Sequence, residues 1–226
     1  PSNDIKSFEG PKDYKLGDLG KVYGHQWRNQ SGIDQVQTVI DRLRKDPMGR
    51  YAIIDGWNPA DFDEMALPPC HLLYQFNCRE VDFEHKRISL SGLGYDYKRS
   101  EVDKAYNELN LPKYYLDLQM YQRSCDTFLG VPFNITSAAL LLHLMAKITN
   151  TIPSKFVWVG GDTHIYENHL AQVSEQLSRD PLDLCTLDIN KQIDSIEDFE
   201  TLTPGDIVFI NYDSFAPIKG ELKTGL

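Results

Sequence analysis

The sequence lacks the features that mark several large classes of protein. No apolar run reaches the roughly 18 residues that a membrane-spanning helix needs, and residues 1–20 lack the basic and then apolar order of a signal peptide. The 23 Lys and Arg residues are outnumbered by 33 Asp and Glu, a net charge of −10. Because nucleic acids are bound through a basic surface, this balance excludes general nucleic-acid binding. We expect a soluble, cytoplasmic protein without membrane or nucleic-acid partners, in which a few local arginines hold any anionic ligand.

Cysteine is scarce. The 4 cysteines contain no C-x-x-C pair and are too few for a disulfide scaffold in a chain of 226 residues. We therefore expect reduced thiols, of which one can serve as a nucleophile. A metal site also has little support, since the spacing of Asp162, His164 and His169 fits no common zinc motif. We expect polar loop residues at these positions, and no metal.

The sequence contains enough apolar material for a sizeable core, with 41% hydrophobic and 11% aromatic residues. Helical spacing of apolar residues predicts helices over 31–46, 135–148 and 167–179. Apolar or alternating stretches predict strands at 51–54, 71–76, 115–122, 155–159 and 206–211. The helix at 135–148 is too short to cross a bilayer, so we expect it to be buried. Strands and helices alternate without repeats, which favours a single α/β (α+β) domain over residues 1–226.

Two segments depart from this regular pattern. Residues 1–20 are polar and are expected to be irregular. Residues 79–113 are highly charged, and we expect an inserted hairpin extension with a short helix that stands off the core. A charged stretch of this kind is usually a solvated face, and contact with a partner is the alternative.

Cys70 is the candidate nucleophile. It lies between a Pro-Pro turn and a predicted strand, with His71 beside it. A nearby cation would favour the reactive thiolate at such a position. The alternative is a buried structural cysteine, which is the usual state of a free cysteine.

Two further polar groups suit an anionic, heterocyclic ligand. Arg123 and Ser124 offer a guanidinium fork and a hydroxyl that fit a phosphate dianion, although an exposed arginine in a salt bridge explains the pattern equally well. Asn134 precedes the apolar stretch at 135–148. It is either the N-cap of that helix or an amide that reads the edge of a heterocycle.

Four strings occur in one order along the chain: Y-G-x-Q-W-R from Tyr23, A-L-P-P-C-H ending at His71, Y-Q-R-S-x-D-x-x-L-G-x-P-F-N from Tyr121 to Asn134, and G-G-D-x-H-x-Y-x-N-H from Gly160 to His169. Together they resemble the thymidylate synthase family, which includes the deoxypyrimidine hydroxymethylases of phages. The resemblance runs from about Gly17 to Leu222 and is interrupted by residues 79–113. It implies a mixed sheet with helices on one side, and a homodimer that packs two sheets back to back.

The resemblance implies a role for each matching residue. The Cys70 thiolate would add to C6 of a pyrimidine nucleotide, and C5 would then attack the methylene of 5,10-methylenetetrahydrofolate. The substrate would be held by Arg123, Ser124, His71, His164 and Tyr166, and the folate by Asp126, Trp57 and Gly130. Tyr23 would handle a proton at C5. An adjacent arginine pair of the family reaches across the dimer to the partner's phosphate, and here it reads Arg50-Tyr51.

Asn134 indicates which base is bound. A carboxamide can donate to O4 of uracil and accept from its N3–H, whereas cytosine presents the opposite pattern at both atoms. An aspartate would favour cytosine. Each mispaired buried group costs about 1 to 3 kcal/mol, which is enough for strong discrimination. We therefore expect dUMP rather than dCMP.

Several departures from the family concern the exclusion of water from the site. The tail after Ile218-Lys219 is longer and more polar, Lys21 replaces a proline, and Ala138 replaces a tyrosine. A family segment with a shielding tryptophan, an arginine and a catalytic glutamate has no counterpart here, so we expect this sequence to be part of a longer chain. We favour a dUMP 5-hydroxymethylase, phage-encoded and acting in the host cytoplasm. The alternatives are a divergent thymidylate synthase and a non-catalytic nucleotide-binding or RNA-binding descendant.

Overall fold

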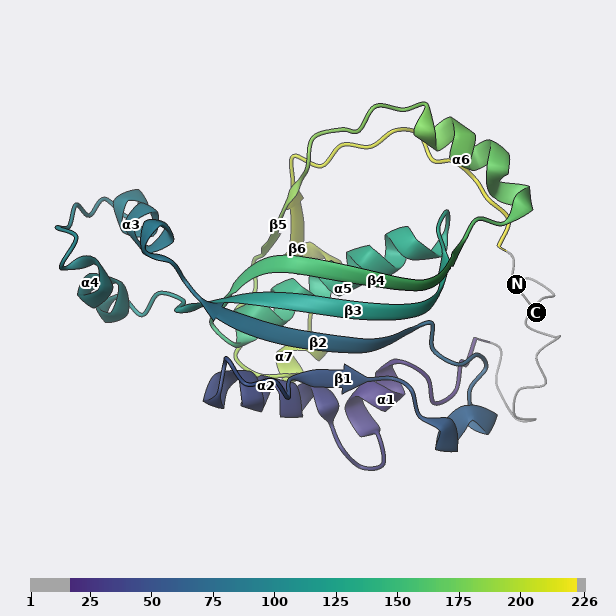
Figure 1. Cartoon of the computed structure of the whole chain (residues 1–226), viewed down its shortest axis with the longest axis horizontal. Coiled ribbons are helices and arrows are strands. Elements are labelled where there is room, and N and C mark those ends of the chain that lie inside the picture. The colour runs from purple at the N-terminus through teal and green to yellow at the C-terminus, as the bar shows by residue number, and fades with distance from the viewer. Residues whose placement is uncertain (1–16, 223–226) are drawn as a thin grey trace.

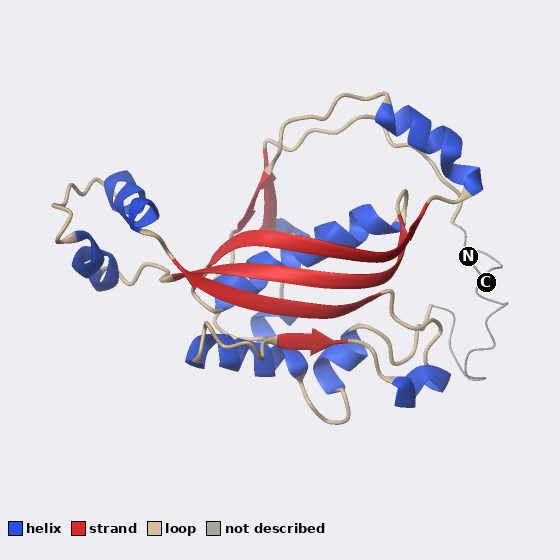
Figure 2. Cartoon of the chain, in the orientation of Figure 1, coloured by secondary structure: helices blue, strands red, loops and turns tan. Residues whose placement is uncertain are grey.

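The computed structural model describes residues 17–222. Residues 1–16 of the predicted irregular segment 1–20 lie outside the described residues. The last four residues of the polar tail, 223–226, also lie outside them. A four-stranded mixed sheet forms the centre (Figures 1 and 2). Its strands, in spatial order, are β1 (Ile53–Asp55), β2 (His71–Glu80), β3 (Tyr114–Asp126) and β4 (Ile152–His164). β3 and β4 are parallel and the other pairs antiparallel.

One face of the sheet carries the core. Leu116, Leu118 and Met120 of β3 alternate with polar residues and are buried, together with Tyr74 and Phe76 of β2. Burial of such side chains contributes about 1.5 to 3 kcal/mol each. Helices cover this face: α1 (Gly24–Asn29), α2 (Gln35–Lys45) and α5 (Gly130–Ile148). A mixed sheet with helices on one side, as expected from the resemblance, is thus confirmed.

The opposite face of the sheet is open in the single chain. Tyr121, Val157 and Val159 alternate with the core residues of β3 and β4 and are 38%, 44% and 37% exposed. Ile53 continues this face on β1 and is 38% exposed. We call the set Ile53, Tyr121, Val157 and Val159 the outer face.

The helix predicted over 31–46 is α2, which begins a few residues later because Asp34 caps it. The Asp34 carboxylate accepts a hydrogen bond from the Gln37 backbone N–H at 2.9 Å. Val36, Val39, Ile40 and Leu43 form its buried stripe. The predicted helix over 135–148 is α5, which starts at Gly130. By length and composition α5 could cross a membrane, but it packs on β3 and β4 with Leu142 and Met145 in the core.

The charged stretch 79–113 holds two helices, α3 (Phe83–Gly92) and α4 (Val102–Glu108), beyond the ends of β2 and β3 (Figure 1). They pack on each other through their own buried cluster: Val81, Leu90, Val102, Ala105 and Tyr106. Tyr115 and Ile152 at the end of the sheet pack against that cluster. The separate cluster explains how this extension stands off the core.

The remaining elements are short. They are the 3-10 turns η2 (Pro59–Glu64), η3 (Glu167–His169) and η4 (Pro204–Asp206), the helices α6 (Leu170–Leu177) and α7 (Glu197–Glu200), and the paired strands β5 (Thr186–Ile189) and β6 (Ile207–Ile210). The helix predicted over 167–179 is η3 followed by α6, and the strand at 206–211 is β6. The sequence did not predict α1 or β5.

Candidate active site

Cys70 and Arg123 meet where β2 begins beside β3. The Arg123 backbone N–H donates to the Cys70 carbonyl at 2.8 Å, and Arg123 Nη2 lies 4.0 Å from Cys70 Sγ. The guanidinium is fixed by donating to the carbonyls of Pro69 at 3.0 Å and Pro68 at 2.8 Å. Arg123 forms no ion pair with the described residues 17–222. The half-buried Cys70 thus has the neighbouring cation that a nucleophilic role requires.

The other cysteines have different surroundings. Cys78 lies in the core, where burial raises the pKa of its thiol to about 11. Burial also raises the pKa of Cys125, which is fully enclosed. Neither thiol is suited to attack at neutral pH.

Tyr23 is held in an uncommon backbone conformation next to Cys70. It precedes α1 with φ 43° and ψ −100°, a region that non-glycine residues rarely adopt. Its hydroxyl oxygen accepts a hydrogen bond from the Cys70 backbone N–H at 3.1 Å. Burial raises the pKa of Tyr23 to about 12, so the phenol is protonated at neutral pH. A protonated hydroxyl beside the thiol can donate a hydrogen bond to a ligand.

His71 is packed between two tyrosines. Its ring stacks on Tyr23 with a centroid distance of 4.3 Å, and its Nδ1 lies 2.6 Å from the Tyr74 hydroxyl. Burial lowers the pKa of His71 to about 4, and burial raises the pKa of Tyr74. The three rings therefore form a neutral polar network behind Cys70.

Asn134 is fixed by Gln122, a residue that the sequence reasoning did not single out. Gln122 is buried on β3, and its Nε2 donates to Asn134 Oδ1 at 2.9 Å and to the Ser124 carbonyl at 3.0 Å. Its Oε1 accepts from Trp158 Nε1 at 3.1 Å. Asn134 lies inside α5 rather than before it, so the N-cap explanation is wrong. The contact with Gln122 leaves the Asn134 NH₂ group available to donate to a ligand.

A second cluster gathers where β3 and β4 end side by side. Asp126 pairs with His164 and Ser124 with Asp162 in the parallel ladder. The Asp126 carboxylate accepts from the backbone N–H groups of Phe128 at 3.2 Å and Leu129 at 3.4 Å, so it also orders the start of α5.

Two more of the predicted site residues lie at this end of the sheet. The His164 and Tyr166 rings meet edge to face at 4.9 Å. Gly130 lies between Asp126 and Asn134: a Cβ there would be 3.5 Å from the Asp126 Cβ and 3.6 Å from Asn134 Oδ1.

Of the two remaining predicted site residues, Trp57 lies beside the cluster of Cys70 and Arg123 and Arg50 lies apart from it. The Arg123 Cζ is 5.8 Å from the centre of the Trp57 indole ring. Arg50 is exposed in the turn before β1. The ladder pairs Ile53 with Gln75, which places Arg50 near the far end of β2. Within one chain, Arg50 is not brought together with Cys70.

The polar tail folds back on the site's flank. His169 is completely buried, and its Nε2 is 2.7 Å from the Glu221 carbonyl. Gly220 lies so close to Phe128 that a Cβ would come within 2.7 Å of its ring. The tail therefore contacts the segment between Asp126 and α5.

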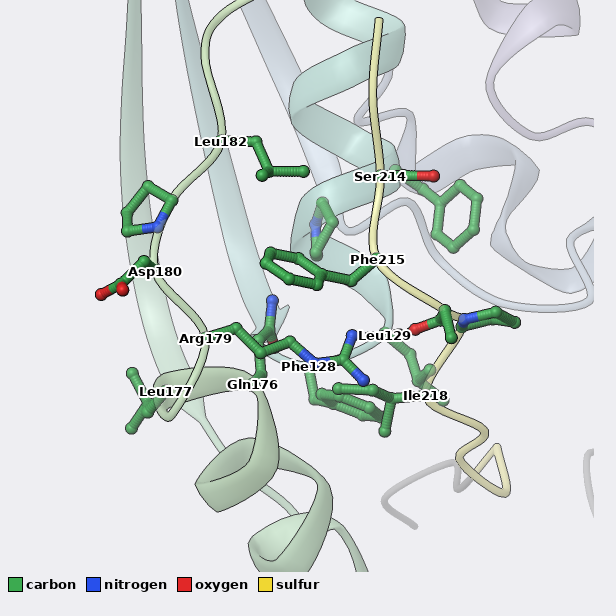
Figure 3. A pocket seen from close by; sticks show the side chains of 15 residues that line it. Phe128, Leu129, Gln176, Leu177, Arg179, Asp180, Leu182, Ser214, Phe215 and Ile218 are labelled. Atoms are coloured by element: carbon green, nitrogen blue, oxygen red, sulfur yellow. Dashed lines mark hydrogen bonds between the residues drawn. The ribbon is translucent and has the colours of Figure 1, made fainter.

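A cavity of about 800 Å³ adjoins this tail (Figure 3). Its walls come from the start of α5, the end of α6 and the segment before the tail, and they include Leu129, Phe133, Leu177, Phe215 and Ile218. Arg179 lies among these apolar residues, with Cζ 5.3 Å from the Phe215 ring centre. Cys70, Arg123 and Asn134 do not line the cavity.

At two positions where the sequence departs from the family, the residue present has a structural role in this chain. Lys21 Nζ pairs with Glu64 at 2.8 Å and Asp61 at 3.5 Å. Ala138 is buried against the sheet. Among residues 17–222, no group of three or more His, Cys, Asp or Glu side chains could hold a metal ion.

Comparisons with known proteins agree with this arrangement. A family model described as Thymidylate synthase matches residues 6–224. The chain is 42% identical over 218 residues to the thymidylate synthase of Enterobacteria phage T4, and 41% identical over 208 residues to that of Malacoplasma penetrans. The matched part is 92% of this chain in each case. It spans 65% of the length of the phage protein and 60% of the length of the Malacoplasma protein. The crystal structure of thymidylate synthase from T4 phage superposes with a TM-score of 0.72, covering 92% of this chain and 65% of that one.

Proposed function

The chain belongs to the thymidylate synthase family, and we propose that it converts dUMP and 5,10-methylenetetrahydrofolate into dTMP and dihydrofolate. The observation that carries this proposal is the placement of Arg123 Nη2 4.0 Å from Cys70 Sγ, at the end of the sheet where Gln122 also fixes Asn134. A nucleophile, an anion-binding cation and a base-reading amide thus come together within one region.

In the proposed reaction the Cys70 sulfur forms a bond to C6 of the pyrimidine. The C5–C6 double bond breaks, and its electron pair makes C5 nucleophilic. The methylene carbon of methylenetetrahydrofolate bonds to C5 and its bonds to the folate nitrogens break, which releases tetrahydrofolate after the C5 proton is lost; a hydride from tetrahydrofolate then turns the methylene into a methyl group and leaves dihydrofolate. Protonated Tyr23 donates a hydrogen bond to a water molecule that removes the C5 proton, since its pKa of about 12 prevents the phenol from acting as the base itself. Cys70 finally leaves C6 and restores the double bond.

The remaining predicted residues orient the substrates. Arg123 and Ser124 bind the phosphate, and His164 and Tyr166 bind the sugar hydroxyl. His71, which is neutral and stacked on Tyr23, supports the base side of the site. Folate lies along Asp126 and Gly130, where the apolar wall at Leu129 and Phe133 suits its aromatic part. Trp57 covers Arg123 on the folate side.

The choice of dTMP over 5-hydroxymethyl-dUMP reverses the preference drawn from the sequence. Curated relatives at 41 to 42% identity are named thymidylate synthase, which favours reduction of the new one-carbon group. The folded tail supports the same choice, since Gly220 and Glu221 close against Phe128 and His169 rather than leaving that flank open to water. The hydroxymethylase remains the second candidate because the tail is polar.

The assembly is proposed to be a cytoplasmic homodimer. The exposed apolar residues of the outer face, such as Tyr121 and Val157, support packing against a second copy, back to back. Arg50, which lies far from Cys70 of its own chain, would then contact the partner's nucleotide phosphate.

Product analysis tests the proposal. The enzyme is incubated with 5-tritiated dUMP and methylenetetrahydrofolate, and tritium release, folate absorbance and the nucleotide product are followed together. We expect tritium release, dihydrofolate and dTMP. Release with tetrahydrofolate and 5-hydroxymethyl-dUMP would support the hydroxymethylase instead. Absence of release would leave only a nucleotide-binding role.

A further inference from the structure

The side chain of Gln26 closes the turn that carries Tyr23. Gln26 lies in the first turn of α1 and is completely buried. Its Nε2 donates to the Lys21 carbonyl at 2.8 Å, so the side chain reaches back across Tyr23. The Tyr23 carbonyl in turn accepts from the Trp27 backbone N–H at 2.9 Å. The backbone on both sides of Tyr23, whose φ of 43° is unusual, is thereby tied to α1.

Gln26 is itself held by two residues from the segment that forms η2. Its Nε2 also donates to Asp61 Oδ2 at 2.8 Å, and its Oε1 accepts from Asn58 Nδ2 at 3.1 Å. Asn58 Nδ2 donates to the same Asp61 oxygen at 2.8 Å. A reversed Gln26 amide would set donor against donor at Asn58, so these contacts fix its orientation.

Asp61 is the common acceptor of this network. Its Oδ2 accepts from both amides, and its Oδ1 lies 3.5 Å from Lys21 Nζ. The Asp61 side chain is only 17% exposed. The hydrogen bond from Gln26 lowers the pKa of Asp61, and an ionised carboxylate is a stronger acceptor than a neutral group. Without this carboxylate the buried Gln26 loses an acceptor and has less to hold it against the Lys21 carbonyl.

The network also borders the loop that carries Trp57. Asn58 follows Trp57 directly and caps η2, since its Oδ1 accepts from the Ala60 backbone N–H at 3.3 Å. Trp57 lies over Arg123, whereas the Tyr23 hydroxyl contacts Cys70. An effect passed through Trp57 should therefore change phosphate binding, and an effect passed through Tyr23 should change the proton step.

We infer that Asp61 is a positioning residue for removal of the C5 proton: through Gln26 it keeps the Tyr23 hydroxyl beside Cys70. This inference rests on the proposed function, in which Tyr23 donates a hydrogen bond to the water that takes that proton. Tyr23 has no part in forming the bond from sulfur to C6 in that scheme. Loss of the Asp61 carboxylate should therefore slow proton removal and leave the addition of Cys70 intact.

Kinetics of Asp61→Ala separate a positioning role from a general loss of structure. The rate of tritium release from 5-tritiated dUMP is divided by the concentration of sites that form a covalent adduct with 5-fluoro-dUMP and methylenetetrahydrofolate, so that inactive protein is not counted. We expect this normalised kcat to fall by about tenfold or more, with KM for dUMP changed by less than about twofold. Asp63→Ala removes an exposed carboxylate from the same turn and should match the wild-type protein.

A double-variant cycle tests whether Asp61 acts through Tyr23. Tyr23→Phe removes the hydroxyl that Asp61 is inferred to place. Adding Asp61→Ala to Tyr23→Phe should therefore lower the normalised kcat by less than about twofold. An equal loss in both backgrounds would show that Asp61 supports the fold in general, and would overturn the inference.

The remaining outcomes separate the inference from the proposed function. A wild-type protein that releases no tritium and forms no adduct overturns both. An active wild-type protein with a normal kcat in Asp61→Ala overturns the inference alone. A raised KM for dUMP with unchanged kcat would place the effect at Trp57 and Arg123, and also overturns it. If Asp61→Ala does not fold, Asp61→Asn keeps the shape without the charge and should show the same fall in kcat.

Discussion

Gln122→Leu is the substitution that most sharply tests how the site is held. Gln122 is buried, and its amide joins Trp158, Ser124 and Asn134. Leucine has a similar volume but no polar atoms, so it leaves the Trp158 N–H, the Ser124 carbonyl and Asn134 Oδ1 without this partner. Unpaired buried groups cost about 1 to 3 kcal/mol each, and since part of this set can reach water we expect a loss of about 2 to 5 kcal/mol in unfolding free energy.

The same substitution should also impair recognition of the base. Without Gln122 the Asn134 amide is free to rotate, so we expect kcat/KM for dUMP to fall by at least about tenfold. Trp158→Phe provides the matched control, since it removes the donor to Gln122 Oε1, together with part of the ring, and leaves the contact with Asn134. We expect that variant to be destabilised by about 1 to 3 kcal/mol with nearly normal kcat/KM.

Urea unfolding and steady-state kinetics of both variants and the double variant check this account. Because the two residues share a hydrogen bond, the double variant should lose less stability than the two single losses added together, by about 1 kcal/mol. Additive losses, or an undiminished kcat/KM in Gln122→Leu, would refute the view that Gln122 fixes Asn134.

Three further predictions concern pH, the extension and the tail. Burial lowers the pKa of His71 from 6.5 to about 4, so the unfolded chain takes up a proton at a higher pH than the folded chain. The free energy of unfolding should therefore fall as the pH drops from about 6.5 toward 4. Urea unfolding should show this fall, and it should be less steep in His71→Gln. Replacing residues 82–112 by Asn-Gly should preserve dTMP formation, since the extension has its own buried cluster; loss of activity in a folded variant would contradict this. Ending the chain after Lys219 should admit water and raise the fraction of 5-hydroxymethyl-dUMP, and an unchanged product ratio would show that the tail does not exclude water.

The elements that the sequence predicted well are those with a strong apolar period. The alternation around Leu116 and Met120 gave β3, and the apolar stripe of α2 gave that helix. The start of α5 was placed too late because Pro132 and Asn134 are typical of loops. Proline is tolerated in the first turn of a helix, where its missing N–H has no intrahelical partner, so α5 begins at Gly130.

The sequence predicted only part of the site. Cys70 directly precedes β2 and Arg123 lies on β3, and the pairing of His71 with Gln122 brings the two together. Gln122 was missed although the alternation of β3 puts it in phase with Leu116, Leu118 and Met120 on the core face; only the fold shows that its amide joins Trp158 and Asn134. The positive φ of Tyr23 likewise has no signal in the sequence, because non-glycine residues rarely adopt it.

The most direct test of the central claim is whether Cys70 becomes bonded to the pyrimidine. With 5-fluoro-dUMP and methylenetetrahydrofolate, fluorine at C5 cannot leave as a proton does, so the reaction should stop with the nucleotide attached. Mass spectrometry of the digested protein should find the adduct on the Cys70 peptide, and Cys70→Ser should form none. An adduct on Cys78, Cys125 or Cys185, or no adduct under conditions where dUMP is turned over, would contradict the assignment of Cys70 as the nucleophile.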